Sequence, residues 1–248
     1  MFNLLKKSTS VNSLLIILLI VAGLYFALAA PPVARAVDND FLLTWSSNSY
    51  VPLDYEGKAL PSRGSTIKVA VLPTKKLSQN PDALYYRWLL DNEIMYSAQG
   101  IGRSSFQFRT TKWGGDDHEI ESQILDSQEK IIWRGFLTIK IASPQILFKT
   151  TNSNYAAQDS LIAATGQNLT LLAEPLFFNT QNIADLAFSW AIDRQILDTL
   201  DEKNPNQLTI KIPAGNLSAS IFKDLSLFIQ NKADQLQQST ANLSVEIK

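Results

Sequence analysis

YRWLLDNEI, at positions 86–94, recurs 102 positions later as FSWAIDRQI, at positions 188–196. Each copy carries one tryptophan, Trp88 or Trp190, flanked by alternating apolar residues, and each then runs into an aspartate at the start of a turn. A repeat of about 100 residues is the length of a small domain. The spacing therefore predicts that the chain contains a duplicated domain.

Apolar residues on either side of the two tryptophans alternate with a period of two, which predicts β-strands. Residues 66–71 show this alternation, and residues 168–173 repeat it 102 positions later. Towards the ends of the repeat the spacing drifts to between 104 and 106, which indicates small loop insertions between strands. The first repeat spans residues 41–142 and the second repeat spans residues 145–248.

The composition of the 248-residue chain, with 46% hydrophobic and 18% charged residues, is typical of globular protein. There is no cysteine, which excludes disulfides, a thiolate nucleophile and a cysteine-ligated metal. After residue 36 the chain carries 19 Lys plus Arg against 23 Asp plus Glu. This balance gives no basic surface, so nucleic acid is not an expected partner.

The N-terminal residues have the pattern of an export segment. Lys6 and Lys7 precede an uncharged apolar run at 14–30, which is followed by two prolines and the small-x-small sequence that ends at Ala36. We expect a hydrophobic helix here, either a cleaved signal peptide or an uncleaved N-terminal membrane anchor. The predicted organisation is then 1–36 for this segment, 37–143 for the first domain and 144–248 for the second.

About seven short strands per repeat, with the tryptophan in the third, predict an antiparallel β-sandwich. The segments 86–94 and 188–196 resemble the strand C, turn and strand C′ of bacterial extracellular immunoglobulin-like and PKD-like domains. The predicted fold is all-β, with two tandem immunoglobulin-like sandwiches. The resemblance implies that Trp88 and Trp190 lie in the core between the sheets. It also implies an adhesive, spacer or ligand-presenting role without chemistry of its own.

His118, the only histidine, lies in an acidic loop with Asp116, Asp117 and Glu119. These three carboxylates could ligate calcium, and histidine could bind a metal or act as an acid–base catalyst. However, the loop lacks the glycine-spaced oxygen pattern of a dedicated calcium site. The favoured interpretation is a structural cap at the start of a late strand, and no cofactor is expected.

Catalysis is not expected from the remaining residues. One histidine and no cysteine leave few nucleophile–base pairs, and no Gly-x-Ser-x-Gly or Ser-x-x-Lys motif occurs in a supporting context. Asp91 and Asp193 recur at the same turn of the two copies. A residue kept in both copies is interpreted as structural, and we expect these carboxylates to accept hydrogen bonds from turn amides.

Aromatic residues that the second repeat lacks are the remaining candidates for a binding site. Tyr50, Tyr55 and Trp113 are candidates for contact with a partner, because flat rings stack on sugars or anchor proteins. Trp45 and Trp133 also lack aromatic counterparts. The alternative interpretation is that such rings cover the open ends of a sandwich core. Features specific to the protein are expected in the loops at 50–63 and 113–119.

The predicted function is that of an exported, non-catalytic interaction or spacer module at the cell surface or in the envelope. The predicted location is extracellular or at the outer face of the cytoplasmic membrane, with contact to the membrane if the N-terminal segment is retained. The expected partner is another surface protein or an envelope polymer. The alternatives are a carbohydrate-binding or calcium-dependent adhesive module, or accessory domains of a separate enzyme. The sequence does not identify the ligand.

Overall fold

The computed structural model describes residues 40–74, 80–150, 156–157, 160–198 and 203–248, and these residues form β-strands and two short 3-10 helices. In the first repeat the elements are β1 (Phe41–Ser47), β2 (Thr66–Pro73), η1 (Pro81–Ala83), β3 (Tyr85–Leu90), β4 (Glu93–Ile94), β5 (Gly100–Ile101), β6 (Ser105–Arg109), β7 (Asp117–Leu125) and β8 (Ile131–Lys140). In the second repeat they are β9 (Gln145–Thr150), β10 (Ala156–Ala157), β11 (Ser160–Ala163), β12 (Asn168–Leu176), η2 (Ile183–Asp185), β13 (Leu186–Ile192), β14 (Gln195–Ile196), β15 (Gln207–Lys211), β16 (Ile221–Asn231) and β17 (Gln238–Ile247).

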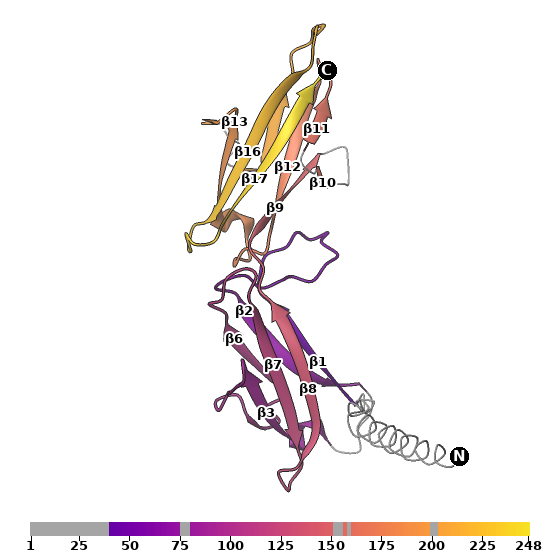
Figure 1. The fold of residues 1–248 in the computed structure, drawn as a ribbon, viewed down its shortest axis with the longest axis vertical. Helices are drawn as coiled ribbons and strands as arrows, with labels where there is room; N and C mark the ends of the chain where they lie inside the picture. The colour runs from indigo at the N-terminus through magenta and orange to yellow at the C-terminus, as the bar shows by residue number, and fades with distance from the viewer. Residues whose placement is uncertain (1–39, 75–79, 151–155, 158–159, 199–202) are drawn as a thin grey trace, which may run out of the picture. The chain divides into compact units, whose positions relative to one another are not determined.

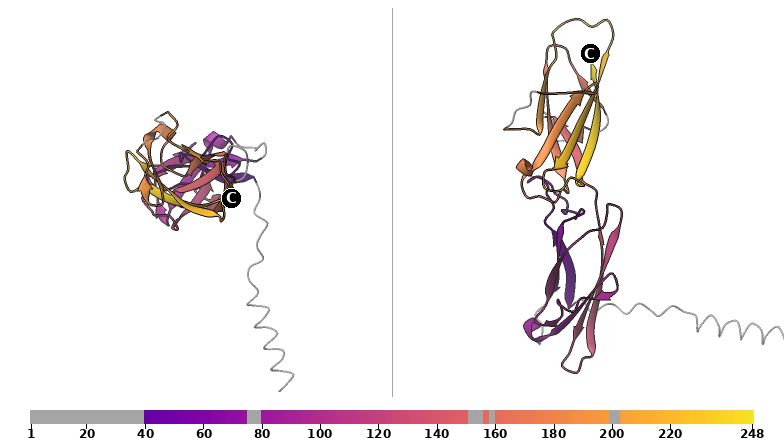
Figure 2. Two further views of the ribbon diagram at one scale, coloured as in Figure 1. Left: turned by 90° about the horizontal axis from the view of Figure 1, so that it is seen from above. Right: turned by 90° about the vertical axis from the view of Figure 1, so that its left-hand side faces the viewer.

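The first repeat is a sandwich of two antiparallel sheets. One sheet has the order β1-β2-β6, and the other has the order β4-β3-β7-β8 with β5 also paired to β3. Figure 1 shows β7 and β8 as long neighbouring strands, and the right-hand view of Figure 2 shows the two sheets as separate layers. Apolar side chains from both layers fill the space between them, as expected from the period-two pattern.

The second repeat has the same plan with one added feature. Its sheets have the orders β10-β9-β12-β15 and β11-β17-β16-β13-β14. All its strand pairs are antiparallel except β11 with β17, which run parallel. In the first repeat, no described strand takes the place that β11 has beside β17. This difference leaves β8 at the edge of its sheet.

The two tryptophans lie at equivalent places in the two cores. The side chains of Trp88 and Trp190 are both 0% exposed, and each belongs to the hydrophobic cluster of its own repeat. The indole N–H of Trp88 donates to the carbonyl of Arg103 at 2.9 Å, and that of Trp190 donates to the carbonyl of Pro205 at 3.0 Å. Both acceptors lie 15 residues beyond the tryptophan, so the copies agree in hydrogen bonding as well as in burial.

The turn after each tryptophan strand also recurs. Asp91 and Asn92 have φ of 51° and 67°, and Asp193 and Arg194 have φ of 51° and 69°. Two consecutive residues of positive φ fit a two-residue type I′ hairpin, whose twist suits the flanking strands. Asp and Asn tolerate this left-handed conformation better than most residues. Arginine, the residue at position 194, is less suited to it.

The predicted all-β fold of tandem immunoglobulin-like sandwiches is confirmed by these sheets. The predicted export segment at 1–36 lies outside the described residues, and the predicted domain limits stay predictions. In the described part of the chain, no helix is long and apolar enough to cross a membrane. The turn between β16 and β17 occupies residues 232–237, and β17 begins at Gln238.

Candidate functional site

Asp91, His118 and Thr110 form a hydrogen-bonded series at one end of the first repeat. His118 Nδ1 lies 2.8 Å from Asp91 Oδ2, and His118 Nε2 lies 2.8 Å from Thr110 Oγ1. Asp91 also accepts a hydrogen bond from the Glu119 amide at 3.0 Å and pairs with Lys112 Nζ at 2.9 Å. The carboxylate therefore joins the β3–β4 turn to the start of β7.

The series contains the residue types of a nucleophile, a base and an orienting acid. Thr110, however, is 0% exposed and His118 is 6% exposed, so a substrate carbonyl cannot reach the hydroxyl in this structure. The Thr110 hydroxyl also accepts a hydrogen bond from the Lys112 amide. The geometry supports a structural role for His118, which holds the turn and the strand together.

The second repeat has the same arrangement with lysine in place of histidine. Asp193 Oδ1 accepts from the Asp224 amide at 3.1 Å, and its Oδ2 lies 2.6 Å from Lys223 Nζ. Lys223 thus takes the place of His118. The sequence prediction that Asp91 and Asp193 bind turn amides needs correction, because their carboxylates accept from amides of the neighbouring strand. The structural interpretation of both residues is retained.

Hydrogen bonds to Asp91 lower the pKa of its carboxyl group. Burial raises the pKa, but the hydrogen bonds from Lys112, the Glu119 amide and His118 outweigh burial, and the net pKa lies below its ordinary value. A carboxyl whose pKa is lower in the folded state contributes stability above its unfolded-state pKa of about 3.9. That contribution is lost as the pH falls through the folded-state pKa.

We therefore expect Asp91→Asn to be less stable than the wild type at neutral pH and to approach it in acid. The difference in free energy of unfolding should be constant above about pH 5 and shrink below about pH 4, because protonation of Asp91 removes the same interactions in the wild type. Urea unfolding between pH 3 and pH 7 measures this difference. Glu93→Gln, at an exposed residue of β4, is the control. A difference that stays constant down to the lowest pH would contradict the role given to Asp91.

The acidic loop does not converge on a common point. Asp116 Oδ2 accepts from the Trp113 amide at 3.1 Å, and the backbone carbonyl of Asp117 accepts from Lys112 Nζ at 2.5 Å. The Glu119 carboxylate lies 3.5 Å from the Asn92 side-chain amide. Among the residues that the structure describes, no three His, Cys, Asp or Glu side chains form a group that could hold a metal ion. The geometry therefore gives these carboxylates local roles.

Tyr50 and Tyr55 contact the second repeat of the same chain. The Tyr50 amide donates to the Phe178 carbonyl at 2.8 Å, and the Phe177 amide donates to the Tyr50 carbonyl at 2.7 Å. The rings of Tyr55 and Phe177 meet edge to face, with centroids 5.9 Å apart. Phe177 has a φ of 62°, an unfavourable value for phenylalanine that the surrounding contacts maintain. The Tyr50 backbone and the Tyr55 ring thus make contacts within the chain.

A second set of contacts supports this junction. The buried side chain of Gln237 donates to Ser62 Oγ at 2.9 Å and to the Arg63 carbonyl, and accepts from the Asn179 amide at 2.5 Å. The Asn179 side chain donates to the Gly64 carbonyl at 2.9 Å. The loop at 50–63, expected to carry specificity, therefore serves in large part to join the two repeats.

Trp113, the third candidate, remains accessible. Its side chain is 53% exposed, and the Arg63 guanidinium lies over the ring with its central carbon 4.3 Å from the centroid. This geometry is a cation–π contact. Of the three aromatic residues predicted to bind a partner, Trp113 is the one with a large exposed ring surface.

A surface that the sequence prediction missed lies on the side of the β4-β3-β7-β8 sheet that faces away from the core, here called the outer face. Phe136 and Ile132 of β8 are 69% and 48% exposed on it. The equivalent residues of β17, 106 positions later, are the polar Asn242 and Gln238. This comparison could have revealed the surface, because it shows apolar residues at solvent-facing positions of one copy alone.

A row of polar side chains crosses the outer face next to Phe136, beginning at Arg134 of β8. Arg134 Nε lies 3.0 Å from Glu121 Oε1, which accepts from Gln123 Nε2 at 2.6 Å. Gln123 in turn accepts from Arg87 at 3.3 Å. These contacts therefore link β8, β7 and β3, and they hold the polar side chains beside the exposed apolar residues.

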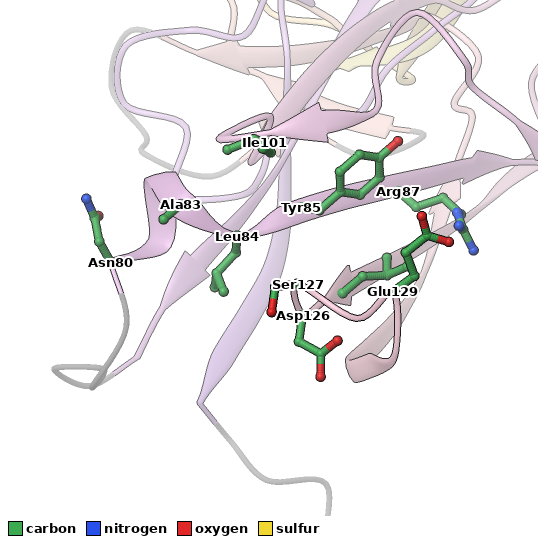
Figure 3. Close-up of a pocket in the computed structure, with 10 residues that line it drawn as sticks. Asn80, Ala83, Leu84, Tyr85, Arg87, Ile101, Asp126, Ser127 and Glu129 are labelled. Atoms are coloured by element: carbon green, nitrogen blue, oxygen red, sulfur yellow. The ribbon is translucent and has the colours of Figure 1, made fainter.

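A pocket of about 640 Å³ lies at the end of this surface. Tyr85 and Arg87 of β3 line it together with Ile101 of β5 and with Asp126 and Glu129 of the β7–β8 turn. Figure 3 shows the Arg87 and Glu129 side chains near each other at one end and Asp126 at another. The pocket combines aromatic, aliphatic and charged groups. Its volume lies within the range of small-molecule sites.

The outer face of the second repeat has a different character. Its hollow of about 680 Å³ is lined mainly by polar side chains, including Arg194, Ser226 and Asn242. The two repeats therefore share their cores and turns but differ at the matched positions of β8 and β17 and in the residues that line these hollows.

No protein-family model and no curated protein sequence matches the chain. Among solved structures, the three N-terminal domains of the bacteriophage RB49 Highly Immunogenic Outer Capsid protein are similar at 10% identity and a TM-score of 0.43, covering 84% of this chain and 59% of that one. The Clostridium thermocellum CbhA fibronectin(III)-like modules are similar at 13% identity and a TM-score of 0.27, covering 83% and 93%. A Bacteroides ovatus glucan-utilisation protein, SGBP-B, solved with a mixed-linkage heptasaccharide, is similar at 12% identity and a TM-score of 0.24, covering 85% and 48%. These TM-scores are too low to indicate a ligand or a function.

Proposed function

We propose that the chain is an exported, non-catalytic binding module of the cell surface or envelope, in which the outer face of the first repeat contacts another macromolecule. The observation that carries this proposal is the difference between the two copies. Phe136 and Ile132 expose apolar surface where the second repeat has Asn242 and Gln238. An apolar patch beside a polar row is typical of a protein-binding surface.

The other features of the first repeat agree with this assignment. His118 and Thr110, the residues closest to a catalytic arrangement, are buried and serve the turn. Export is supported by the N-terminal sequence, in which Lys6 and Lys7 precede the apolar run at 14–30. The second repeat acts as a support for the first through the Tyr50 and Gln237 contacts.

The duplication supplies an internal control for a crosslinking test. We expect a photoreactive phenylalanine at position 136, in the full chain in its own cells, to give a crosslinked product on illumination. The same residue at position 242, the matched position of the second repeat, should give none, because the second repeat has the polar Asn242 there. The shift of the chain in a denaturing gel measures the product. Equal products at both positions, or none at either, would contradict the proposed function.

A further inference from the structure

In the second repeat, the edge of β17 is covered by β11. The equivalent strand of the first repeat, β8, has no such partner among the described strands. In the second repeat, β11 pairs in parallel with β17, from Ser160 opposite Ser244 to Ala163 opposite Ile247. In the first repeat, β8 pairs with β7 and with no other described strand. The counterpart of β11, 104 positions earlier, falls at 56–59 and forms no strand there.

Residues 56–61 instead approach the sheet at its very end. The Ser47 hydroxyl donates to the Ala59 carbonyl at 2.9 Å, and the Ala142 amide donates to the Pro61 carbonyl at 2.8 Å. Ser47 is the last residue of β1 in the opposite sheet, and Ala142 lies beyond the last residue of β8. The edge from Arg134 to Lys140 is therefore left open by the loop.

At alternate residues of β8, the backbone N–H and C=O groups point away from β7. The Ile141 amide bonds to the Asp116 carbonyl of the loop before β7, whereas the Ala142 amide faces the other way, towards Pro61. Since successive amides of a strand point in opposite directions, those of Lys140, Thr138, Phe136 and Arg134 also face away from β7. The edge thus offers a row of donors and acceptors without a backbone partner among the described residues, which is the requirement for adding a strand.

The charged residues of β8 indicate which kind of strand is favoured at this edge. Lys130, Arg134 and Lys140 lie on β8 or at its start, and β8 carries no acidic residue. Arg134 is paired with Glu121, whereas Lys130 and Lys140 have no side-chain partner among the described residues. If two copies paired antiparallel about Gly135, Lys140 of one would lie opposite Lys130 of the other, and like charges opposite each other are destabilising. Charge therefore disfavours a second copy and favours an acidic occupant.

We infer that the outer edge of β8, from Arg134 to Lys140, receives an extended segment of another protein as an additional β-strand. On the outer face, the side chains of the segment are apolar next to Phe136 and Ile132 and acidic next to Lys130 and Lys140. Backbone hydrogen bonds to the outward-facing amides supply the register. This inference rests on the proposed function and specifies how the same surface binds.

The test uses the crosslink from position 136 and removes one outward-facing amide. Thr138→Pro deletes that donor at a position where an edge strand tolerates proline, and should reduce the crosslinked product about tenfold. Thr138→Ala keeps the amide and removes the side-chain hydroxyl and methyl groups, and should leave the product unchanged. The melting temperature of each purified full chain shows whether the variant is folded.

Charge variants give a second readout that does not depend on tolerance of proline. Lys130→Glu with Lys140→Glu should also reduce the product about tenfold by repelling an acidic segment. Lys68→Glu, an exposed change on the opposite sheet, is the control and should have no effect. A product that resists both Thr138→Pro and the charge reversal would overturn the strand addition but leave the proposed function intact. A product of twice the mass of the chain would indicate a second copy and also overturn it, and the absence of any product from position 136 would overturn both.

Discussion

Alanine at Trp88 or Trp190 is expected to lower the free energy of unfolding by about 3–5 kcal/mol in each case. Each indole is 0% exposed at the centre of its core, so truncation leaves a cavity that the surrounding strands cannot fill. Each change also leaves the carbonyl of Arg103 or Pro205 without its donor. Chemical denaturation followed by circular dichroism measures the loss.

Trp113→Ala is the matched control for these two substitutions. Its ring is 53% exposed and contacts Arg63 through a cation–π interaction, so the expected loss is about 1 kcal/mol or less. If Trp88→Ala or Trp190→Ala proved no more destabilising than Trp113→Ala, the position of that tryptophan between the sheets would be refuted.

His118→Ala is expected to destabilise the first repeat by about 1–3 kcal/mol, because it removes the partner of a buried hydroxyl and of a carboxylate. The Thr110 hydroxyl is fully buried, and water cannot replace the imidazole there without entering the core. Asp91 would keep Lys112 and the Glu119 amide, so the turn should persist in a weakened form. Thermal and urea unfolding at neutral pH measure the effect.

Lys223→Ala is the equivalent change in the second repeat. Lys223 and Asp193 are 44% and 43% exposed, so solvent screens their interaction and water can replace it. We expect a clearly smaller change than for His118→Ala. Equal effects at the two positions would show that burial does not distinguish the partners of the two aspartates, and would contradict the structural role assigned to His118.

The core was predictable because duplication allowed each strand to be compared with its copy. Ile67, Val69 and Val71 are buried as their alternation predicts, and Trp88 and Trp190 are equally buried, although Trp88 packs against Phe106 and Trp190 against Phe148. Successive side chains of a strand point to opposite faces, so a period-two apolar pattern in the local sequence identifies the buried face. Burial of the core and the type of sheet therefore followed from the sequence.

The aromatic residues were harder to interpret because their burial depends on distant parts of the chain. Trp133, grouped with the candidates for exposure, is buried against Phe41 with ring centroids 5.5 Å apart, and its ring extends over Gly135, which has no side chain to displace it. Tyr50 and Tyr55 contact residues more than 120 positions away. No local pattern encodes such contacts.

The outer face was missed for a related reason. An exposed Phe136 in a strand is uninformative by itself, since single apolar residues are common on protein surfaces. Its meaning depends on the polar Asn242 at the matched position and on which neighbours β8 has in the sheet. Strand neighbours are set by pairings between distant segments, as the parallel contact of β11 with β17 illustrates.

That parallel contact has a consequence for how the two repeats fold next to each other. Tandem domains of similar sequence can exchange strands while they fold, which yields misassembled molecules. Because β11 covers the outer edge of β17, an incoming strand of the first repeat finds that edge occupied once the second repeat has folded. Of the two matched strands, β8 therefore has the edge that is open to such an exchange, and β17 does not.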